Sequence, residues 1–225
     1  MSLILSLETS AKVCSVAIHD GEELRATSEI HIEQSHASKL AVLIEEVRNK
    51  AGIEFKQLSA VAISSGPGSY TGLRIGTSTA KGLCFSLNLP LISIGSLELL
   101  AFQMRDQPAQ AFLCPMIDAR RMEVYCLIAD SKLNVILPIE AKVIDEHSFQ
   151  EYLDKKEVIF FGDGSDKCKE KITHKNARFI TGIYPKASQL GLIAHNKFQK
   201  KELEDLTTFE PHYLKEFMIK SKAVN

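Results

Sequence analysis

The fold is decided by Val61-Ala-Ile-Ser-Ser-Gly-Pro-Gly-Ser-Tyr-Thr-Gly-Leu-Arg-Ile-Gly-Thr-Ser-Thr-Ala-Lys-Gly-Leu-Cys84. The stretch starts as a short apolar run rich in β-branched residues, breaks at Gly66-Pro67-Gly68, and continues with apolar residues at helical spacing. It predicts a strand, a tight loop and a helix. A glycine-rich loop before a helix is a common anion site, because free backbone N–H groups and the helix dipole both favour negative charge.

The loop matches neither common phosphate motif. Leu73 follows Gly72 where a Walker A loop needs Lys, and Thr71 stands where G-x-G-x-x-G needs its third Gly. Pro67 also removes one backbone donor. Two interpretations therefore stay open: an anion site, or a tight turn before a closely packed helix.

Small residues form a stripe along the predicted helix. Gly72, Gly76 and Ala80 recur every four residues and share one face, which lets another helix approach closely. Each Gly costs roughly 1 kcal/mol relative to Ala, so we expect the groove to be used, by a helix of the same fold or by another subunit. In the second case Gly76→Leu would abolish assembly while the chain stays folded.

Composition bounds the class of protein. The chain has 225 residues, of which 45% are apolar, and a formal net charge of −1. That length suffices for one large domain or two lobes, and the charge argues against a strongly basic nucleic-acid surface, though not against a local patch. There is no apolar run of about 18 residues and no basic signal region at the start, so we expect no membrane partner and a cytoplasmic location.

The spacing of the cysteines and histidines favours neither disulfides nor a metal site. The five cysteines are odd in number, widely spaced and free of any C-x-x-C pair, which indicates reduced, buried thiols. His31 and His36 are five residues apart, whereas two ligands on one helix face are three or four apart. We therefore predict no metal site.

The first half of the chain reads as one α/β lobe. Strand-like runs at 3–7 and 13–18 flank a polar elbow, and residues 24–30 add a third strand. A helix follows from Ser35, with apolar residues at helical spacing. Polar residues 105–110 interrupt the pattern, so we predict one lobe over 1–106 and a second, reduced lobe over 107–225.

The second half echoes the first. Placing Asp118 on Glu8 aligns residues 111–117 with the first strand without a gap, and 158–165 repeats the apolar run and Gly-x-Gly-Ser of 62–69. The echo predicts a duplicated α/β fold. Two elbows and two glycine loops that face each other across a cleft could hold nucleotide phosphates, with a carboxylate of one elbow positioning Mg²⁺ through water. Alternatively, the elbows are ordinary turns and their acidic side chains are solvated. The residues concerned are Glu8, Thr9, Ser10, Gly66, Gly68 and Ser69 in the first lobe, and Asp118, Arg120, Gly162 and Gly164 in the second.

Five motifs in the chain resemble the TsaB (YeaZ) family, the bacterial partners of the tRNA threonylcarbamoyladenosine transferase TsaD. They are Leu7-Glu-Thr-Ser10, Gly66-Pro-Gly-Ser-Tyr-Thr-Gly-Leu-Arg-Ile-Gly76, Ala80-Lys-Gly-Leu83, Asp118-Ala-Arg-Arg-Met-Glu-Val-Tyr125 and Pro211-His-Tyr-Leu214. The resemblance implies a duplicated actin-like and sugar-kinase-like (ASKHA) fold with a reduced second lobe.

The resemblance also implies a function in tRNA modification. The chain would be a scaffold or dimerisation subunit that supports TsaD in making N6-threonylcarbamoyladenosine, with no catalytic residue of its own. The His-x-x-x-His metal pair of TsaD is absent, as is any G-x-S-x-G elbow, so neither transferase nor glycoprotease activity is expected. No cofactor is required, and weak binding of ATP or ADP with Mg²⁺ stays open. The alternative is an independent nucleotide-binding ATPase or phosphotransferase of the actin-like fold.

Partners follow from the same resemblance. Family members pair through two helices of the first lobe, with TsaD or, when alone, with a second copy. The ATPase TsaE binds the assembled pair, and the chain is expected to act on tRNA indirectly, through the complex. By position the helices are 35–50 and 72–85. The interface residues predicted are His36, Leu40, Leu43, Gly72, Gly76, Thr79 and Ala80.

Overall fold

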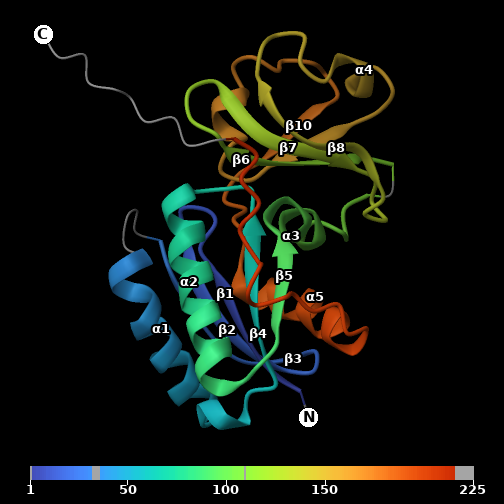
Figure 1. Cartoon of the computed structure of the whole chain (residues 1–225). Helices are drawn as coiled ribbons and strands as arrows, with labels where there is room; N and C mark the ends of the chain where they lie inside the picture. Colours follow the sequence, from blue (N-terminus) through green and yellow to red (C-terminus); the bar gives the residue numbers. More distant parts are fainter. Residues whose placement is uncertain (1, 32–35, 109, 216–225) are drawn as a thin grey trace, which may run out of the picture.

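The structure is a computed structural model that describes residues 2–31, 36–108 and 110–215, with only the backbone at His36. Two lobes are stacked end to end, each built on a five-stranded sheet (Figure 1). The predicted strand, loop and helix at the centre of the chain are present as β4 (Ala60–Gly66) and α2 (Tyr70–Leu87).

The first sheet has the order β3-β2-β1-β4-β5. Its other strands are β1 (Leu3–Glu8), β2 (Cys14–Asp20), β3 (Glu23–Ile30) and β5 (Leu91–Gly95). The central strand β1 pairs antiparallel with β2 and parallel with β4, so the hairpin elbow and the glycine loop leave the sheet at the same end. The elbow and the loop therefore meet.

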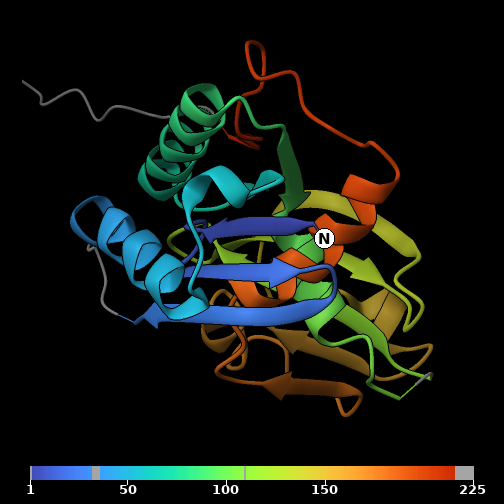
Figure 2. The ribbon, with the colours of Figure 1, turned by 90° about the horizontal axis from the view of Figure 1, so that it is seen from below.

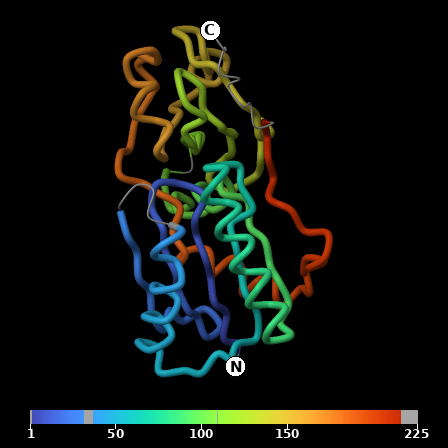
Figure 3. The backbone as a smooth tube through the Cα atoms, turned by 60° about the vertical axis from the view of Figure 1, so that its left-hand side comes forward, coloured from blue at the N-terminus to red at the C-terminus, as the bar shows by residue number. Residues whose placement is uncertain are grey.

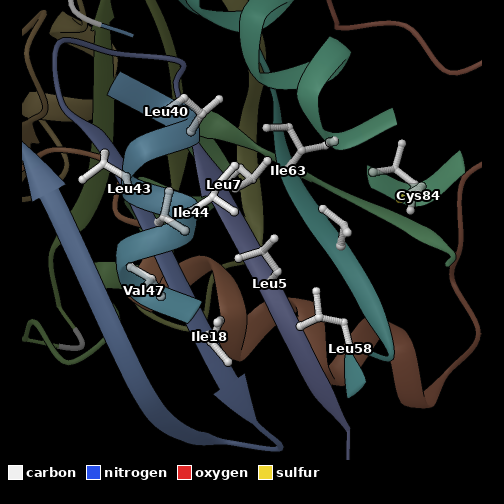
Figure 4. Close-up of a cluster of buried hydrophobic side chains, with 14 of the residues drawn as sticks. Leu5, Leu7, Ile18, Leu40, Leu43, Ile44, Val47, Leu58, Ile63 and Cys84 are labelled. Atoms are coloured by element: carbon white, nitrogen blue, oxygen red, sulfur yellow. The ribbon is translucent and has the colours of Figure 1, made fainter. Parts of the chain in front are cut away.

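Helices cover both faces of this sheet. α1 (His36–Ala51) and α2 lie on one side (Figure 2). The short 3-10 turn η1 (Phe55–Gln57) connects α1 to β4. The apolar side chains of α1 point down onto Leu5, Leu7 and Ile18 of the sheet (Figure 4). Burying one apolar face of an amphipathic helix in this way is what stabilises it.

The second sheet repeats the first. Its order β10-β9-β6-β7-β8, taken from the other edge, has the same connections as the first sheet, with β6 antiparallel to β7 and parallel to β9. The strands are β6 (Phe112–Asp118), β7 (Glu123–Ala129), β8 (Val135–Val143), β9 (Val158–Phe161) and β10 (Ala177–Ile180). The predicted duplicated α/β fold is confirmed.

The second lobe is reduced where the first carries its large helices. The four-residue α4 (Gln150–Leu153) stands in the place of α1, and the 3-10 turn η2 (Asp166–Cys168) stands in the place of α2. Between the sheets lies α3 (Ser96–Gln103), whose Leu97 and Leu100 pack on the second sheet and whose Leu99 packs on the first. The two lobes thus share a continuous apolar contact.

The chain ends by returning to the first lobe, which corrects the predicted second lobe of 107–225. α5 (Ala187–Gln199) packs on the open face of the first sheet, where Leu190 and Ala194 contact Ile4. Residues 200–215, here called the strap, then run along β5 and across α2 (Figure 3). Short apolar runs do not show which of two similar sheets they will cover.

The strap is held by backbone bonds and one buried ring. The Glu204 N–H donates to the Leu91 carbonyl at 2.9 Å, and the His212 N–H donates to the Ser65 carbonyl at 2.7 Å. Between them Phe209 is buried in the core beneath α2. Across the described residues, no helix combines the length and apolar character that crossing a membrane requires.

Gly191 sets how closely α5 approaches the first sheet. A Cβ at this position would lie 2.1 Å from Nδ1 of the fully buried His19. We expect Gly191→Ala to lower the free energy of unfolding by about 2 kcal/mol, because a well-packed core resists an added methyl group. Urea denaturation measures the change. His19→Ala in the same chain should recover part of the loss, and an unchanged urea midpoint in the single variant would contradict the contact.

Candidate functional site

The first glycine loop is closed on the elbow between β1 and β2. The Ser69 N–H donates to the Ser10 carbonyl at 2.7 Å, and a Cβ on Gly68 would lie 2.2 Å from that oxygen. The Ser69 hydroxyl caps α2 by accepting the Gly72 N–H at 3.2 Å. The loop therefore uses its glycine for close backbone contact, and the Ser69 donor is not free to bind an anion.

The small-residue stripe of α2 faces the same elbow. A Cβ on Gly72 would lie 2.1 Å from the Thr9 carbonyl oxygen, and one on Gly76 would lie 2.2 Å from Thr9 Oγ1. Ala80 is fully buried. The prediction that these three residues face a partner is wrong, because the elbow fills the groove at Gly72 and Gly76 and Ala80 is buried in the core of the first lobe.

Two of the predicted interface residues on α1 are also internal. Leu40 and Leu43 are each 2% exposed and pack on the first sheet (Figure 4), so the prediction that they contact a partner is wrong. Thr79 is half-buried, and its hydroxyl donates to the Ile75 carbonyl at 2.9 Å. The His36 side chain and Ser35 lie outside the described residues.

In the second lobe the glycine loop closes on the end of strand β6, which precedes the second elbow. The Gly164 N–H donates to the Met116 carbonyl at 3.1 Å, and a Cβ on Gly162 would lie 2.2 Å from the same oxygen. The Asp118 N–H donates to Asp163 Oδ1 at 3.2 Å. The echo in the sequence therefore corresponds to a repeated packing device.

A lysine that the sequence did not single out occupies the second elbow. The Lys167 ammonium pairs with the Asp118 carboxylate and donates to the carbonyls of Arg121 at 2.7 Å and Glu123 at 2.6 Å. Arg120 and Arg121 have φ values of 69° and 51°, and both residues are exposed. Nothing in the local sequence pairs Lys167 with Asp118, because the two meet only when η2 folds back on β6.

Glu8 is a buried carboxylate at the base of the first elbow. Its Oε1 accepts the Ser10 N–H and the Ser10 hydroxyl, each at 2.6 Å, while Oε2 has no partner of good geometry within the described structure. Burial raises the pKa of Glu8, the Ser10 bonds and the nearby Ser64 hydroxyl oppose the rise, and the Asp163 charge adds to it. Burial likewise raises the pKa of Asp163, and the charge of Asp118 adds to that rise. Carboxylates from both lobes therefore meet here.

Two of the backbone donors and one of the acids around the elbows already have partners within the chain. The Ser69 N–H is already bonded to the Ser10 carbonyl of the first elbow, the Gly164 N–H to the Met116 carbonyl of β6, and Lys167 already neutralises Asp118. Among residues 2–31, 36–108 and 110–215, no three His, Cys, Asp or Glu side chains are placed to hold a metal ion. The nucleotide roles of Thr9, Ser10, Gly66 and Arg120 stay predictions.

Comparison with known proteins shows the family to which the chain belongs. The family model described as TsaD, tRNA N6-adenosine threonylcarbamoyltransferase, matches residues 29–223. The tRNA threonylcarbamoyladenosine biosynthesis protein TsaB of Buchnera aphidicola subsp. Schizaphis graminum is 30% identical over 196 residues, which cover 79% of this chain and 90% of that protein. The chain belongs to the TsaB (YeaZ) family.

Two further relatives agree with the family. TsaB of Buchnera aphidicola subsp. Acyrthosiphon pisum is 35% identical over 124 residues, but the match spans only 55% of this chain and 56% of that protein. The solved structure of YeaZ from Pseudomonas aeruginosa is 24% identical and superposes with a TM-score of 0.82 over 95% of this chain and 100% of that one. At this identity the superposition shows that the fold is that of YeaZ.

Gly76 tests the internal position of the stripe. Its Cβ would also lie 2.9 Å from Ile63 Cδ1, so Gly76→Ala should lower the free energy of unfolding by about 1–2 kcal/mol despite the better helix propensity of Ala. The control is Gly82→Ala on the same helix, where a Cβ meets nothing within 4 Å and stability should rise by about 0.5–1 kcal/mol. Urea midpoints compare the two variants, and equal midpoints would place the stripe at the surface.

Glu8→Gln should stabilise the chain at neutral and alkaline pH. The raised pKa means that the native state holds the proton more tightly than the unfolded chain, so the contribution of Glu8 is present at low pH and lost as the pH rises through the raised value. Gln keeps an oxygen for the Ser10 donors and removes the buried charge. We expect a gain of about 1 kcal/mol at pH 8 that disappears near pH 4, measured by urea denaturation. A variant less stable than the natural chain at pH 8 would contradict the explanation.

Proposed function

We propose that the chain is the non-catalytic subunit that supports a TsaD-type transferase in forming threonylcarbamoyladenosine in tRNA. Its membership of the TsaB family supports the pathway, because the relatives above are tRNA threonylcarbamoyladenosine biosynthesis proteins. The closed elbows support a structural rather than a catalytic subunit. Burial raises the pKa of Cys14 to about 12 and of Cys84 to about 11, which makes both thiols poor nucleophiles.

The outer face of α1 and α2 is the surface that we assign to the partner. Phe85 on α2 is 84% exposed and Val42 on α1 is 59% exposed, although large apolar side chains normally avoid water. Gly82 and Ser86 lie four residues apart on the outward side of α2, and both are exposed. A groove of small residues beside an exposed ring suits the close approach of a partner helix.

This surface replaces the stripe predicted from the sequence. Two small-residue stripes run along α2, and the one at Gly72, Gly76 and Ala80 is taken by the elbow of the same chain. The same outward face would serve a TsaD-type subunit or, without it, a second copy of this chain. A TsaE-type ATPase would join the assembled pair, and tRNA would be met through the complex. The five buried free cysteines fit a reducing compartment, the cytoplasm.

The function is tested by reconstitution. Threonylcarbamoylation of tRNA by a purified TsaD-type transferase should depend on adding this chain, and the chain alone should neither modify tRNA nor hydrolyse ATP. ATP turnover by the isolated chain would instead favour the alternative of an independent ATPase.

Phe85→Ser should weaken binding of the TsaD-type subunit by roughly thirtyfold, the effect of losing one central apolar contact. Calorimetry of the purified pair measures the affinity. Val143→Ser is the matched control, because Val143 is 68% exposed but lies on β8 of the second lobe. Gly82→Leu should also block pairing while the chain stays folded, since its Cβ meets open space. Unchanged affinity in both α2 variants would remove this face from the interface.

A further inference from the structure

A cavity of about 280 Å³ lies between α2 and the strap. Its α2 wall is formed by Arg74, Thr77, Ser78 and Lys81, which follow one another at the spacing of a single helix face. Two cations and two hydroxyls therefore converge on one wall. The opposite wall comes from the strap and includes part of the Pro211-His-Tyr-Leu motif, whose purpose the fold alone does not explain.

The two cations have unequal freedom. The Lys81 ammonium donates to the strap carbonyls of Thr207 at 3.4 Å and Phe209 at 3.1 Å, which fixes its position at the cavity. The Arg74 guanidinium stacks over the Tyr70 ring, 4.2 Å from its centroid, and makes no ion pair with any residue that the structure describes. Stacking leaves the guanidinium edge available for the paired hydrogen bonds that oxyanions accept.

Thr77 supplies an independent indication of a missing partner. Thr77 is one of the lining residues and is only 6% exposed, and its buried Oγ1 has no hydrogen-bond partner within the described part of the chain. Thr79, two residues further along the helix, satisfies its hydroxyl by donating to the Ile75 carbonyl four residues earlier. A buried hydroxyl is costly to leave unpaired, so the Thr77 hydroxyl fits a ligand acceptor.

We propose that this cavity binds the phosphate group of a small phosphate monoester. Arg74 and Lys81 supply the positive charge, the hydroxyls of Thr77 and Ser78 donate to phosphate oxygens, and the Tyr213 ring forms a side wall for the rest of the ligand. Glu210 also lines the cavity and offsets one of the two cations, which favours a single phosphate over a triphosphate. The volume is at the lower end for ligand sites, so the ligand is small.

The proposal is tested on the full chain by calorimetric titration with inorganic phosphate, with chloride keeping the ionic strength constant. The natural chain should show one saturable site. Arg74→Gln should weaken phosphate binding tenfold or more, and Thr77→Val should weaken it about fivefold, the scale of one charged and one neutral hydrogen bond. Arg105→Gln is the matched control, because Arg105 also stacks over an aromatic ring, 4.1 Å from the centroid of Phe102, but lies in the turn that follows α3. This variant should bind phosphate as the natural chain does.

Two results would overturn the proposal. One is the absence of saturable phosphate binding, or equal affinity in the Arg74, Thr77 and Arg105 variants. The other is tight, Arg74-dependent binding of a short single-stranded RNA without binding of inorganic phosphate or glycerol phosphate, which would assign the cavity to a nucleic-acid backbone. Thr77→Val preserves the side-chain shape and removes a hydroxyl without a partner, so it keeps the test valid even if Arg74→Gln reduces stability.

Discussion

The contact between the Thr9–Ser10 elbow and the glycine face of α2 is the interaction on which the rest of the structure depends. Backbone and Thr9 oxygens lie where side chains at Gly68, Gly72 and Gly76 would stand, so only hydrogen at those positions lets the helix settle. The contact fixes the start of α2 over the ends of β1 and β4. Once α2 is held in this position, its opposite side faces outward and the strap packs across the helix.

The second lobe also has a closely packed glycine loop, but no long helix follows it. Gly162 and Gly164 close on Met116 and Ile117 as the first loop closes on its own elbow, yet a short 3-10 turn follows instead of a long helix. Lys167 from that turn neutralises Asp118 and caps two carbonyls of the elbow. The second elbow is thus occupied by the chain's own ammonium group.

α5 and the strap cover parts of the first lobe and leave other parts of its surface exposed. α5 closes the open face of the first sheet, and the strap covers one flank of α2 through Phe209 and His212. The uncovered outward face carries Phe85 and the small residues around Gly82, and it is the surface that we propose for a partner. The flank under the strap keeps the polar wall of Arg74 and Lys81. A single helix therefore contributes to the core, to a cavity and to the proposed docking surface.

The order of local elements could be predicted from the sequence, because apolar periodicity and the breaks at Gly and Pro are local signals. The echo of Glu8 in Asp118 likewise indicated the duplication, and the motifs pointed to the family. What the sequence could not determine was which side of α2 faces inward, because the stripe at Gly76 and the stripe at Gly82 have the same spacing and are both made of small residues. Only the tertiary structure decided between them: the position of Thr9 above α2 is set by strand pairing far along the chain, and helical spacing carries no information about what lies opposite.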